Sequence, residues 1–202
     1  APVEGVITYG SMNAFGKLSD ATLDLWCDLL AAVPEARLLM HALEGGPRRR
    51  VQEWLARKGL EPARVEFLGH LPLLEYFKAY HCVDIALDPF PCAGGTTTCD
   101  ALWMGVPVVT LAGGTSLSRA GLSVLSIVGL EEFVARSAGD YIEVAAGLAR
   151  NRPRLAELKS SLRARMESSR LMDAKAFALD VDRAFRDMWR IWCASTTSPK
   201  CL

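Results

Sequence analysis

The feature that most constrains this chain is an alternation of short apolar runs with segments of helical periodicity. The apolar runs are rich in Val, Ile and Leu and mostly apolar on both faces, which is typical of strands in a parallel sheet covered on both sides. Such alternation predicts a Rossmann-like, three-layer α/β domain. The expected strands are Val6–Met12, Arg37–Ala42, Val65–Gly69, Asp84–Leu87 and Val106–Leu111.

Helix signals fall between and after these strands. Ser19 is a natural N-cap for a helix over Asp20–Val33, in which apolar residues form one stripe. A helical third after Gly113 is long for a single Rossmann domain. Further helices are expected around Val51–Leu55 (closed by Gly59), from Pro72 to His81, from the threonine cluster to Gly105, and over Leu117–Val128, Asp140–Arg150, Arg154–Ser168 and Lys175–Ala194.

Length and charge exclude several classes of function. The 202 residues carry a formal net charge of zero and are half apolar, which suffices for one full core. Balanced charge offers no footprint for nucleic acid or an anionic membrane, and no apolar run approaches the roughly 20 residues of a membrane span. We expect one domain over residues 1–195 and a disordered tail over residues 196–202.

Cysteine and histidine usage predicts neither a metal site nor a disulfide framework. The six cysteines and three histidines show no CxxC or paired-ligand spacing, so we expect a reducing, cytoplasmic setting. The N-terminus lacks the basic segment and apolar stretch of a secretory signal. Because the first residue is Ala1 rather than Met, we expect a piece of a longer chain.

The stretch Asp88–Gly113, DPFPCAGGTTTCDALWMGVPVVTLAG, places a glycine–threonine run between two apolar strands. In parallel sheets, ligands bind beyond the carboxyl ends of strands, where the next helix begins. The amides of Gly95, Thr96 and Thr97 at a helix start, with the threonine hydroxyls beside them, suit a phosphate. Plain helix capping by threonine explains the same residues. The pattern is neither GxGxxG nor a P-loop, so NAD and ATP folds are not supported.

Asp100 lies one helical turn after Thr96 and on the same face. A carboxylate there accepts hydrogen bonds from ribose hydroxyls. An exposed first-turn aspartate, favoured by the helix dipole, is the structural alternative.

These residues carry a family resemblance. "GGTTTCDALWMGVPVVT", preceded by "VDIALDPFPC", resembles the nucleotide-sugar segment of the O-linked N-acetylglucosamine transferase family with its SPINDLY-like and bacterial relatives. "ITYGSMNAFGKLSDATLDLW" and "GTSLSRAGLSVLSIVGLEEFVA" are similar to two further family segments. The likeness runs in order from Val6 to Trp192.

The resemblance implies a GT-B glycosyltransferase, in which two Rossmann-like domains face a cleft. It implies transfer of a sugar, such as N-acetylglucosamine from UDP-GlcNAc, to a Ser or Thr hydroxyl with inversion, and with neither a cofactor nor a required metal. This chain resembles the C-terminal, donor-binding half. The catalytic histidines belong to the N-terminal half, and protein acceptors are read by upstream domains such as a tetratricopeptide array.

Family roles transfer to individual positions. Lys17 matches the lysine at the diphosphate, where a cation stabilises the charge that develops on the leaving group. Thr96 and Thr97 match the threonine pair that holds the phosphates. Asp100 matches the ribose-binding aspartate, and Cys92 matches a cysteine near the donor sugar.

Other positions frame the donor pocket. Gly94 and Gly95 supply the close backbone turn. Leu71 begins a segment similar to the family's Ala-Pro-Lys-x-x-His, in which Tyr76 replaces the histidine and offers a π-face for stacking on the base. Arg119 lies in a loop expected to face the cleft, as a donor or acceptor contact.

The chain also departs from the family pattern. Gly95 stands where the family has a histidine, Ala14 where it has a glutamine, Leu73 where it has a lysine, and Ala79 where it has an arginine. Base identity, UDP or GDP, therefore stays open. A degenerate nucleotide-binding or protein-interaction module is one alternative function, and a GT-B enzyme with a non-protein acceptor is another.

The remaining conspicuous residues are expected to be structural. His70 is interpreted as a locally satisfied histidine and the run Arg48–Arg50 as a solvated helix start. A final helix crossing to the other half of a GT-B enzyme fits the aromatic cluster near the C-terminus. The tryptophans assigned to the core are Trp26, Trp54 and Trp103, and the cluster is Phe185, Trp189 and Trp192.

Overall fold

The computed structural model describes residues 5–196, in which a six-stranded, all-parallel sheet has the strand order β3-β2-β1-β4-β5-β6. The order reverses between β1 and β4, whose neighbouring residues Tyr9 and Ile85 are paired. This is the Rossmann order, and its reversal marks the place where such sheets bind ligands. The strands are β1 (Thr8–Ser11), β2 (Arg37–His41), β3 (Val65–Leu68), β4 (Ile85–Leu87), β5 (Val108–Leu111) and β6 (Val134–Ala135).

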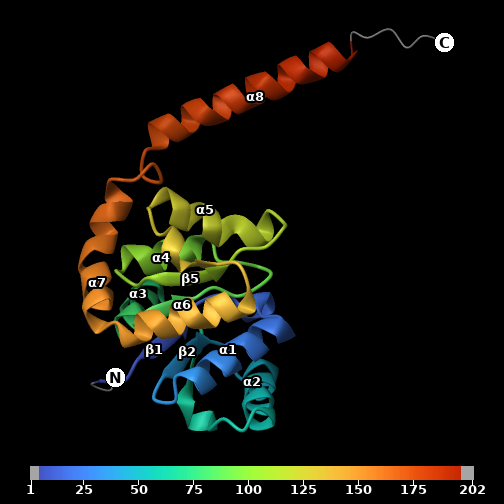
Figure 1. Ribbon diagram of the computed structural model, residues 1–202. Coiled ribbons are helices and arrows are strands. Elements are labelled where there is room, and N and C mark those ends of the chain that lie inside the picture. The colour runs from blue at the N-terminus through green and yellow to red at the C-terminus, as the bar shows by residue number, and fades with distance from the viewer. Residues whose placement is uncertain (1–4, 197–202) are drawn as a thin grey trace, which may run out of the picture.

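Helices cover both faces of the sheet (Figure 1). On one face α1 packs on α2 and α6; on the other, α4 packs on α5, and α7 contacts both α4 and α6. The helices are α1 (Asp20–Ala32), α2 (Gly46–Arg57), α3 (Leu73–Ala79), α4 (Thr96–Trp103), α5 (Ala120–Ile127), α6 (Ala138–Arg150), α7 (Arg152–Glu167) and α8 (Ala174–Thr196). Short 3₁₀ turns join them: η1 (Phe15–Lys17), η2 (Pro62–Arg64), η3 (Tyr80–Cys82), η4 (Leu117–Arg119) and η5 (Glu131–Phe133).

A buried hydrogen-bonded chain crosses the core. Trp26 of α1 donates through Nε1 to the hydroxyl of Tyr141 on α6 at 3.3 Å. That hydroxyl in turn donates to the carbonyl of Asp88 at 3.2 Å. Both aromatic side chains are almost fully enclosed, and buried polar groups need such partners. These two hydrogen bonds therefore connect helices α1 and α6 to the residue that follows β4.

The five expected strands are confirmed, but β6 was not anticipated. It has two residues, Val134–Ala135, and follows a 3₁₀ turn inside a region whose pattern is helical. A segment this short has no measurable alternation. The expected N-cap Ser19 is confirmed, because its side chain accepts from the amide of Thr22. Thr196 is the last residue of α8, and the rest of the expected tail lies outside the described residues.

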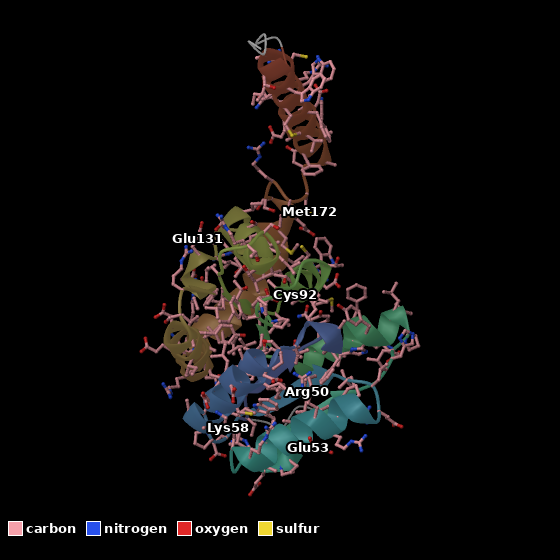
Figure 2. All side chains as sticks on the ribbon, turned by 90° about the vertical axis from the view of Figure 1, so that its right-hand side faces the viewer. Arg50, Glu53, Lys58, Cys92, Glu131 and Met172 are labelled. Atoms are coloured by element: carbon pink, nitrogen blue, oxygen red, sulfur yellow. The ribbon has the colours of Figure 1, made fainter. Side chains whose placement is uncertain are left out.

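The arginine run at the start of α2 is more than a solvated helix end. Arg48 donates to the carbonyl of Ala42 at 3.0 Å. Arg50 pairs with Asp20 of α1 at 2.5 Å, where α2 meets α1 (Figure 2). Only Arg49 is exposed within this run, so the expectation of a solvated start was wrong for the other two arginines.

The tryptophans differ in burial. Trp26 is in the core, 1% exposed. Trp54 and Trp103 are half-buried, and each indole is covered by an arginine, Arg57 and Arg163 respectively. An arginine over an aromatic face shields it from water while keeping its own charge solvated. The core assignment therefore holds fully for Trp26 alone among the three.

Helix α8 extends away from the α/β domain (Figure 1). Its apolar residues recur at helical spacing, yet they are 54–68% exposed at Phe177, Phe185, Met188, Trp189 and Trp192. An amphipathic helix normally buries such a stripe. A contiguous exposed apolar face of this kind marks an interaction surface.

We predict that Gly105→Ala destabilises the fold. Gly105 ends α4 with φ at 78°, and an added Cβ would lie 2.7 Å from the backbone oxygen of Lys159 on α7. Strain and overlap together lower the free energy of unfolding by roughly 2 to 4 kcal/mol. Urea unfolding followed by circular dichroism measures it.

The matched control is Gly147→Ala, on the exposed face of α6. An added Cβ there meets nothing within 4 Å, and alanine raises helix propensity, so stability should increase by about 0.5 to 1 kcal/mol. Equal effects at the two glycines would show that neither the positive φ of Gly105 nor its close contact with α7 limits the residue at this position.

Candidate functional site

The candidate site lies at the carboxyl edge of the sheet, where β1 and β4 are neighbours. The loop after β1 leads into η1 and carries Asn13 and Lys17. The loop after β4 leads through Cys92 and two glycines into α4. Because parallel strands end at the same edge, residues about 80 positions apart in the sequence meet there.

Asn13 is the meeting point of the two loops. Its Oδ1 accepts from Lys17 Nζ at 3.3 Å and from Thr97 Oγ1 at 2.8 Å. Lys17 Nζ also donates to the carbonyl of Ala93 at 3.2 Å. The ammonium group is thus held against the turn that precedes α4, as the assignment of Lys17 to a diphosphate requires.

The turn itself is shaped by its two glycines. Gly94 is buried, and an added Cβ would come within 2.6 Å of Asp88 Oδ1 and 2.8 Å of Thr97 Oγ1. Gly95 differs, because an added Cβ there meets nothing within 4 Å. Close packing therefore requires glycine at position 94, whereas the space beside Gly95 is open, at the position where the resembled family has a histidine.

The start of α4 has no side-chain cap. Its N-cap residue is Gly95, and the hydroxyls of Thr97 and Thr98 are used elsewhere, on Asn13 and on Asp88. Helix-start amides without a capping side chain are an anion-binding arrangement. Of the two explanations for the threonine cluster, threonine capping therefore finds no support in this geometry.

Asp88 is the buried base of the turn. It is 3% exposed, and Thr98 Oγ1 donates to it at 3.1 Å. Burial raises the pKa of Asp88 from 3.8 to about 6, while hydrogen bonding, from Thr98 first, and the charge of Lys17 act in the opposite direction. Asp88 thus lies behind the turn, and the nearby positive charge of Lys17 favours its ionised form.

Asp100 is linked to the helix that follows β3. Tyr76 on α3 donates to Asp100 Oδ2 at 2.7 Å, and its oxygen lies 2.9 Å from the hydroxyl of Tyr80. Tyr80 donates to the carbonyl of Thr97 at 3.3 Å. Burial raises the pKa of Tyr76 well above its ordinary value, and the neighbouring carboxylate raises it further, so its hydroxyl remains a donor. Asp100 is therefore oriented by Tyr76.

A cavity of about 330 Å³ adjoins this cluster. It reaches the size range of small-molecule sites, and Tyr76, the residue proposed from the sequence to stack on the base, is among its lining residues. Its walls come from the ends of three strands and two helices: Met12 and Ala14 after β1, His41 at the end of β2, Leu68–Leu71 after β3, Tyr76 of α3 and Thr97 of α4.

The other predicted residues lie around this centre. Cys92 is half-buried in the loop before the glycine turn (Figure 2). Thr96 is exposed at the first position of α4, and Arg119 is exposed at the end of η4. Leu73 is 70% exposed on α3 and does not line the cavity. Hydrogen bonds link Lys17 and Thr97 through Asn13 and link Asp100 to Tyr76. The side chain of Arg119 takes part in none of these bonds.

A second cavity, of about 490 Å³, also borders α3. It is lined by residues of β2, β3 and α3, and it shares Leu68 and Leu71 with the first cavity. No residue of α3 is fully buried. Helix α3 therefore contributes to the walls of two cavities.

Residues 5–196 gather no group of three or more His, Cys, Asp or Glu side chains arranged to hold a metal ion. In the same range, no helix combines the length and apolar character that crossing a lipid bilayer requires.

Sequence reasoning missed four residues of this site: Asn13, Asp88, Tyr80 and His41. Asn13 and Asp88 each follow a strand at the binding edge, a position that itself signals function in parallel sheets. Tyr80 lies one helical turn after Tyr76, a spacing that places the two on one face. His41 ends β2, and the sequence pattern marks it only as part of the expected strand Arg37–Ala42.

Comparison with known proteins identifies the family. The model of glycosyl transferase family 41 matches residues 2–181. The chain belongs to glycosyl transferase family 41. A rice protein (Oryza sativa subsp. japonica) named "Probable UDP-N-acetylglucosamine--peptide N-acetylglucosaminyltransferase SPINDLY" is 40% identical over 197 residues, which is 96% of this chain and 21% of the relative. The chain thus spans about a fifth of the length of this family 41 relative.

Solved structures agree with the family assignment. A mutant of the Thermobaculum terrenum O-GlcNAc transferase matches with a TM-score of 0.87 and 37% identity, over 98% of this chain and 38% of that one. The expected fold, one half of a GT-B glycosyltransferase, is confirmed. Anabaena Alr3699/HepE in complex with UDP-glucose matches with a TM-score of 0.61 at 17% identity, over 89% of this chain and 49% of that one, which supports the fold alone.

We predict that the ionisation of Asp88 weakens the fold as pH rises. The folded protein retains this proton up to about pH 6, whereas an unfolded aspartate releases it near 3.8, so protonation favours the folded state between these values. Between about pH 4 and about pH 7, wild type therefore loses roughly 2 to 3 kcal/mol that Asp88→Asn does not lose.

Chemical unfolding of both proteins at a series of pH values measures this difference. The other carboxylates are common to both proteins and cancel in the comparison. Parallel stability curves for wild type and Asp88→Asn would show that the Asp88 pKa is not raised in the folded state.

Proposed function

We propose that this chain is the donor-binding half of a protein O-glycosyltransferase and that its donor is a nucleoside-diphosphate sugar. The observation that carries this proposal is the convergence of Lys17, Thr97 and the glycine turn on Asn13 at the switch point of the sheet. One cation and uncapped helix-start amides match the two negative groups of a diphosphate. Membership of family 41 supports the same function.

The proposed chemistry is displacement at the anomeric carbon of the donor sugar. The oxygen of an acceptor Ser or Thr hydroxyl forms a bond to this carbon, the bond from the carbon to the diphosphate oxygen breaks, and the configuration inverts. The nucleoside diphosphate leaves with the bonding electrons. Lys17 and the start of α4 stabilise the charge on the leaving group, while the hydroxyl proton passes to a base in the N-terminal half. We propose that this reaction requires neither a metal ion nor another cofactor.

Different residues of the site are proposed to contact the ribose, the base and the sugar of the donor. Asp100, oriented by Tyr76, accepts hydrogen bonds from the ribose hydroxyls. Tyr76 and Leu71 line the cavity proposed for the base, and Cys92 lies on the side of the sugar. UDP-GlcNAc is the first donor to test, because relatives carry it in their names. GDP and ADP are tested beside UDP, because Leu73 and Ala79 depart from the resembled family pattern around the base pocket.

The partners follow from the same assignment. The acceptor is a protein held by domains upstream, and the apolar face of α8 packs on the N-terminal half of the same protein. Exposed aromatic side chains on α8 support this contact. We assign the protein to the cytoplasm, because the six cysteines of the sequence lack the spacing of a disulfide framework.

A nucleotide-binding or interaction module without transferase activity is the second candidate. It is favoured by Gly95, Ala14 and Leu73, each of which lacks a polar side chain that the resembled family uses. Sugar transfer by the full-length protein, abolished by Lys17→Ala, would exclude it.

We predict that the 202-residue chain binds a nucleoside diphosphate without turning over a sugar donor. Lys17→Ala should weaken this binding by about tenfold or more, because a charge-assisted contact is lost. Thr96→Ala should have a smaller effect, because the backbone amide survives. Isothermal titration calorimetry with UDP, GDP and ADP measures the affinities.

Lys175→Ala on α8 is the matched control for the loss of a lysine and should bind like wild type. If wild type bound none of the three nucleotides, the proposed function would be wrong. Equal affinities for wild type, Lys17→Ala and Thr96→Ala would contradict the phosphate assignment alone.

We predict that Trp189→Asp on α8 separates binding from transfer. In the 202-residue chain it should leave nucleotide affinity unchanged, because α8 stands away from the donor site (Figure 1). In the full-length protein it should lower sugar transfer by about tenfold or more, since a buried interface tryptophan typically contributes that much. A transfer assay with Lys175→Asp as control tests this, and undiminished transfer would remove α8 from the interface.

A further inference from the structure

Two histidines line the cavity beside Lys17 and Thr97, the residues proposed to hold the diphosphate and called here the diphosphate cradle. His41 ends β2 and His70 follows β3, and both belong to the wall of the 330 Å³ space. The strands are paired at this point, with His41 opposite Leu68. Two imidazoles from adjacent strands therefore reach the same cavity from the sheet edge.

Neither imidazole has a hydrogen-bond partner within residues 5–196. His41 is half-buried, and its Nδ1 is enclosed without a partner. Polar atoms enclosed in a protein are nearly always hydrogen-bonded, so an unpartnered one requires an explanation. The earlier interpretation of His70 as a locally satisfied histidine has no hydrogen bond to support it.

The other polar groups on the cavity wall are already engaged. The hydroxyl of Tyr76 is bonded to Asp100, and that of Thr97 is bonded to Asn13. The remaining walls are apolar and include Met12, Leu68 and Leu71. The cavity thus combines apolar walls with two histidines to which no described residue is hydrogen-bonded.

A flat heterocycle with apolar faces and hydrogen-bonding edges has the matching chemistry. We propose that His41 and His70 contact the edge of the nucleobase and determine which base the donor carries. This deepens the proposed function and rests on it. The cradle of Lys17 and Thr97 would hold the diphosphate, Asp100 the ribose, and the imidazoles the base, in the order in which a nucleotide presents these groups.

The protonation of His41 is compatible with this role. Burial lowers its pKa below the ordinary histidine value, and the nearby His70 lowers it further. A neutral imidazole presents one donor and one acceptor, as a nucleobase edge does. His70 is exposed and is free to adjust when a ligand enters.

The decisive experiment compares nucleotides with inorganic pyrophosphate. Pyrophosphate carries the diphosphate without ribose or base. By calorimetry on the 202-residue chain at neutral pH, His41→Ala should bind its tightest nucleoside diphosphate about tenfold more weakly than wild type, the effect of losing one hydrogen bond to an enclosed group. Its affinity for pyrophosphate should not change, whereas Lys17→Ala should lose both.

Two further variants serve as controls, one for the loss of a histidine elsewhere and one for misfolding of His41→Ala. His81→Ala is the matched control, because His81 is exposed on η3 and does not line the cavity. His41→Asn retains hydrogen-bonding capacity and should recover part of the nucleotide affinity if His41→Ala is poorly folded. We also expect His41→Ala to change the ratio of affinities for UDP and GDP, which a merely structural role would leave constant.

The outcomes are distinguishable. Nucleotide binding by wild type with unchanged affinity in both His41→Ala and His70→Ala would overturn the role of the histidines and leave the proposed function standing. Equal losses for nucleotide and pyrophosphate would overturn it as well, since the effect would then lie in the cradle. If wild type bound no nucleotide, both the histidine role and the proposed function would fall.

Nuclear magnetic resonance gives an independent reading, because the chain has three histidines in all. Adding the nucleotide should shift the imidazole signals of His41 and His70 and leave that of His81 in place. Adding pyrophosphate should shift them much less. Equal shifts at all three histidines would contradict direct contact.

Discussion

The arrangement of the site depends on one buried carboxylate. Asp88 directly follows β4, its side chain accepts from Thr98 of α4, and its carbonyl accepts from Tyr141 of α6. Through Tyr141 the same position is joined to Trp26 of α1. Helices from both faces of the sheet are thus tied to a single residue. A buried charge is tolerated only when surrounded by such partners, so the turn in front of Asp88 is rigidly placed.

Rigid placement matters because the cradle is built from two loops distant in sequence. Lys17 arrives from the loop after β1, and Thr97 from the helix after β4. The parallel sheet brings the loops to one edge, and Asn13 connects them. Preorganised charges and dipoles stabilise a developing negative charge without reorganising during the reaction. Fold and proposed chemistry therefore depend on the same few hydrogen bonds.

Much of this molecule could be predicted from the sequence, and the exceptions have physical causes. Strand runs such as Arg37–Ala42 are mostly apolar, and Ser19 is a strong cap, so the sequence predicts these elements. The two residues of β6 carry no periodic signal. The bond from Tyr76 to Asp100 depends on how α3 packs against α4, which local patterns do not encode. Arg48 and Arg50 acquired structural roles because their partners lie on other elements. The free imidazole of His41 became visible only when its neighbours were known.

The local stability of helix α3 would affect how tightly a ligand binds. It has seven residues, none fully buried, and it borders two cavities of about 490 and 330 Å³. Elements with so few buried contacts open locally at low free energy, and their amide hydrogens exchange early with solvent. Occupation of the smaller space would give α3 a packed neighbour and suppress this opening. Part of the intrinsic binding free energy is then used to order the helix, so the observed affinity depends on the local stability of α3 as well as on direct contacts.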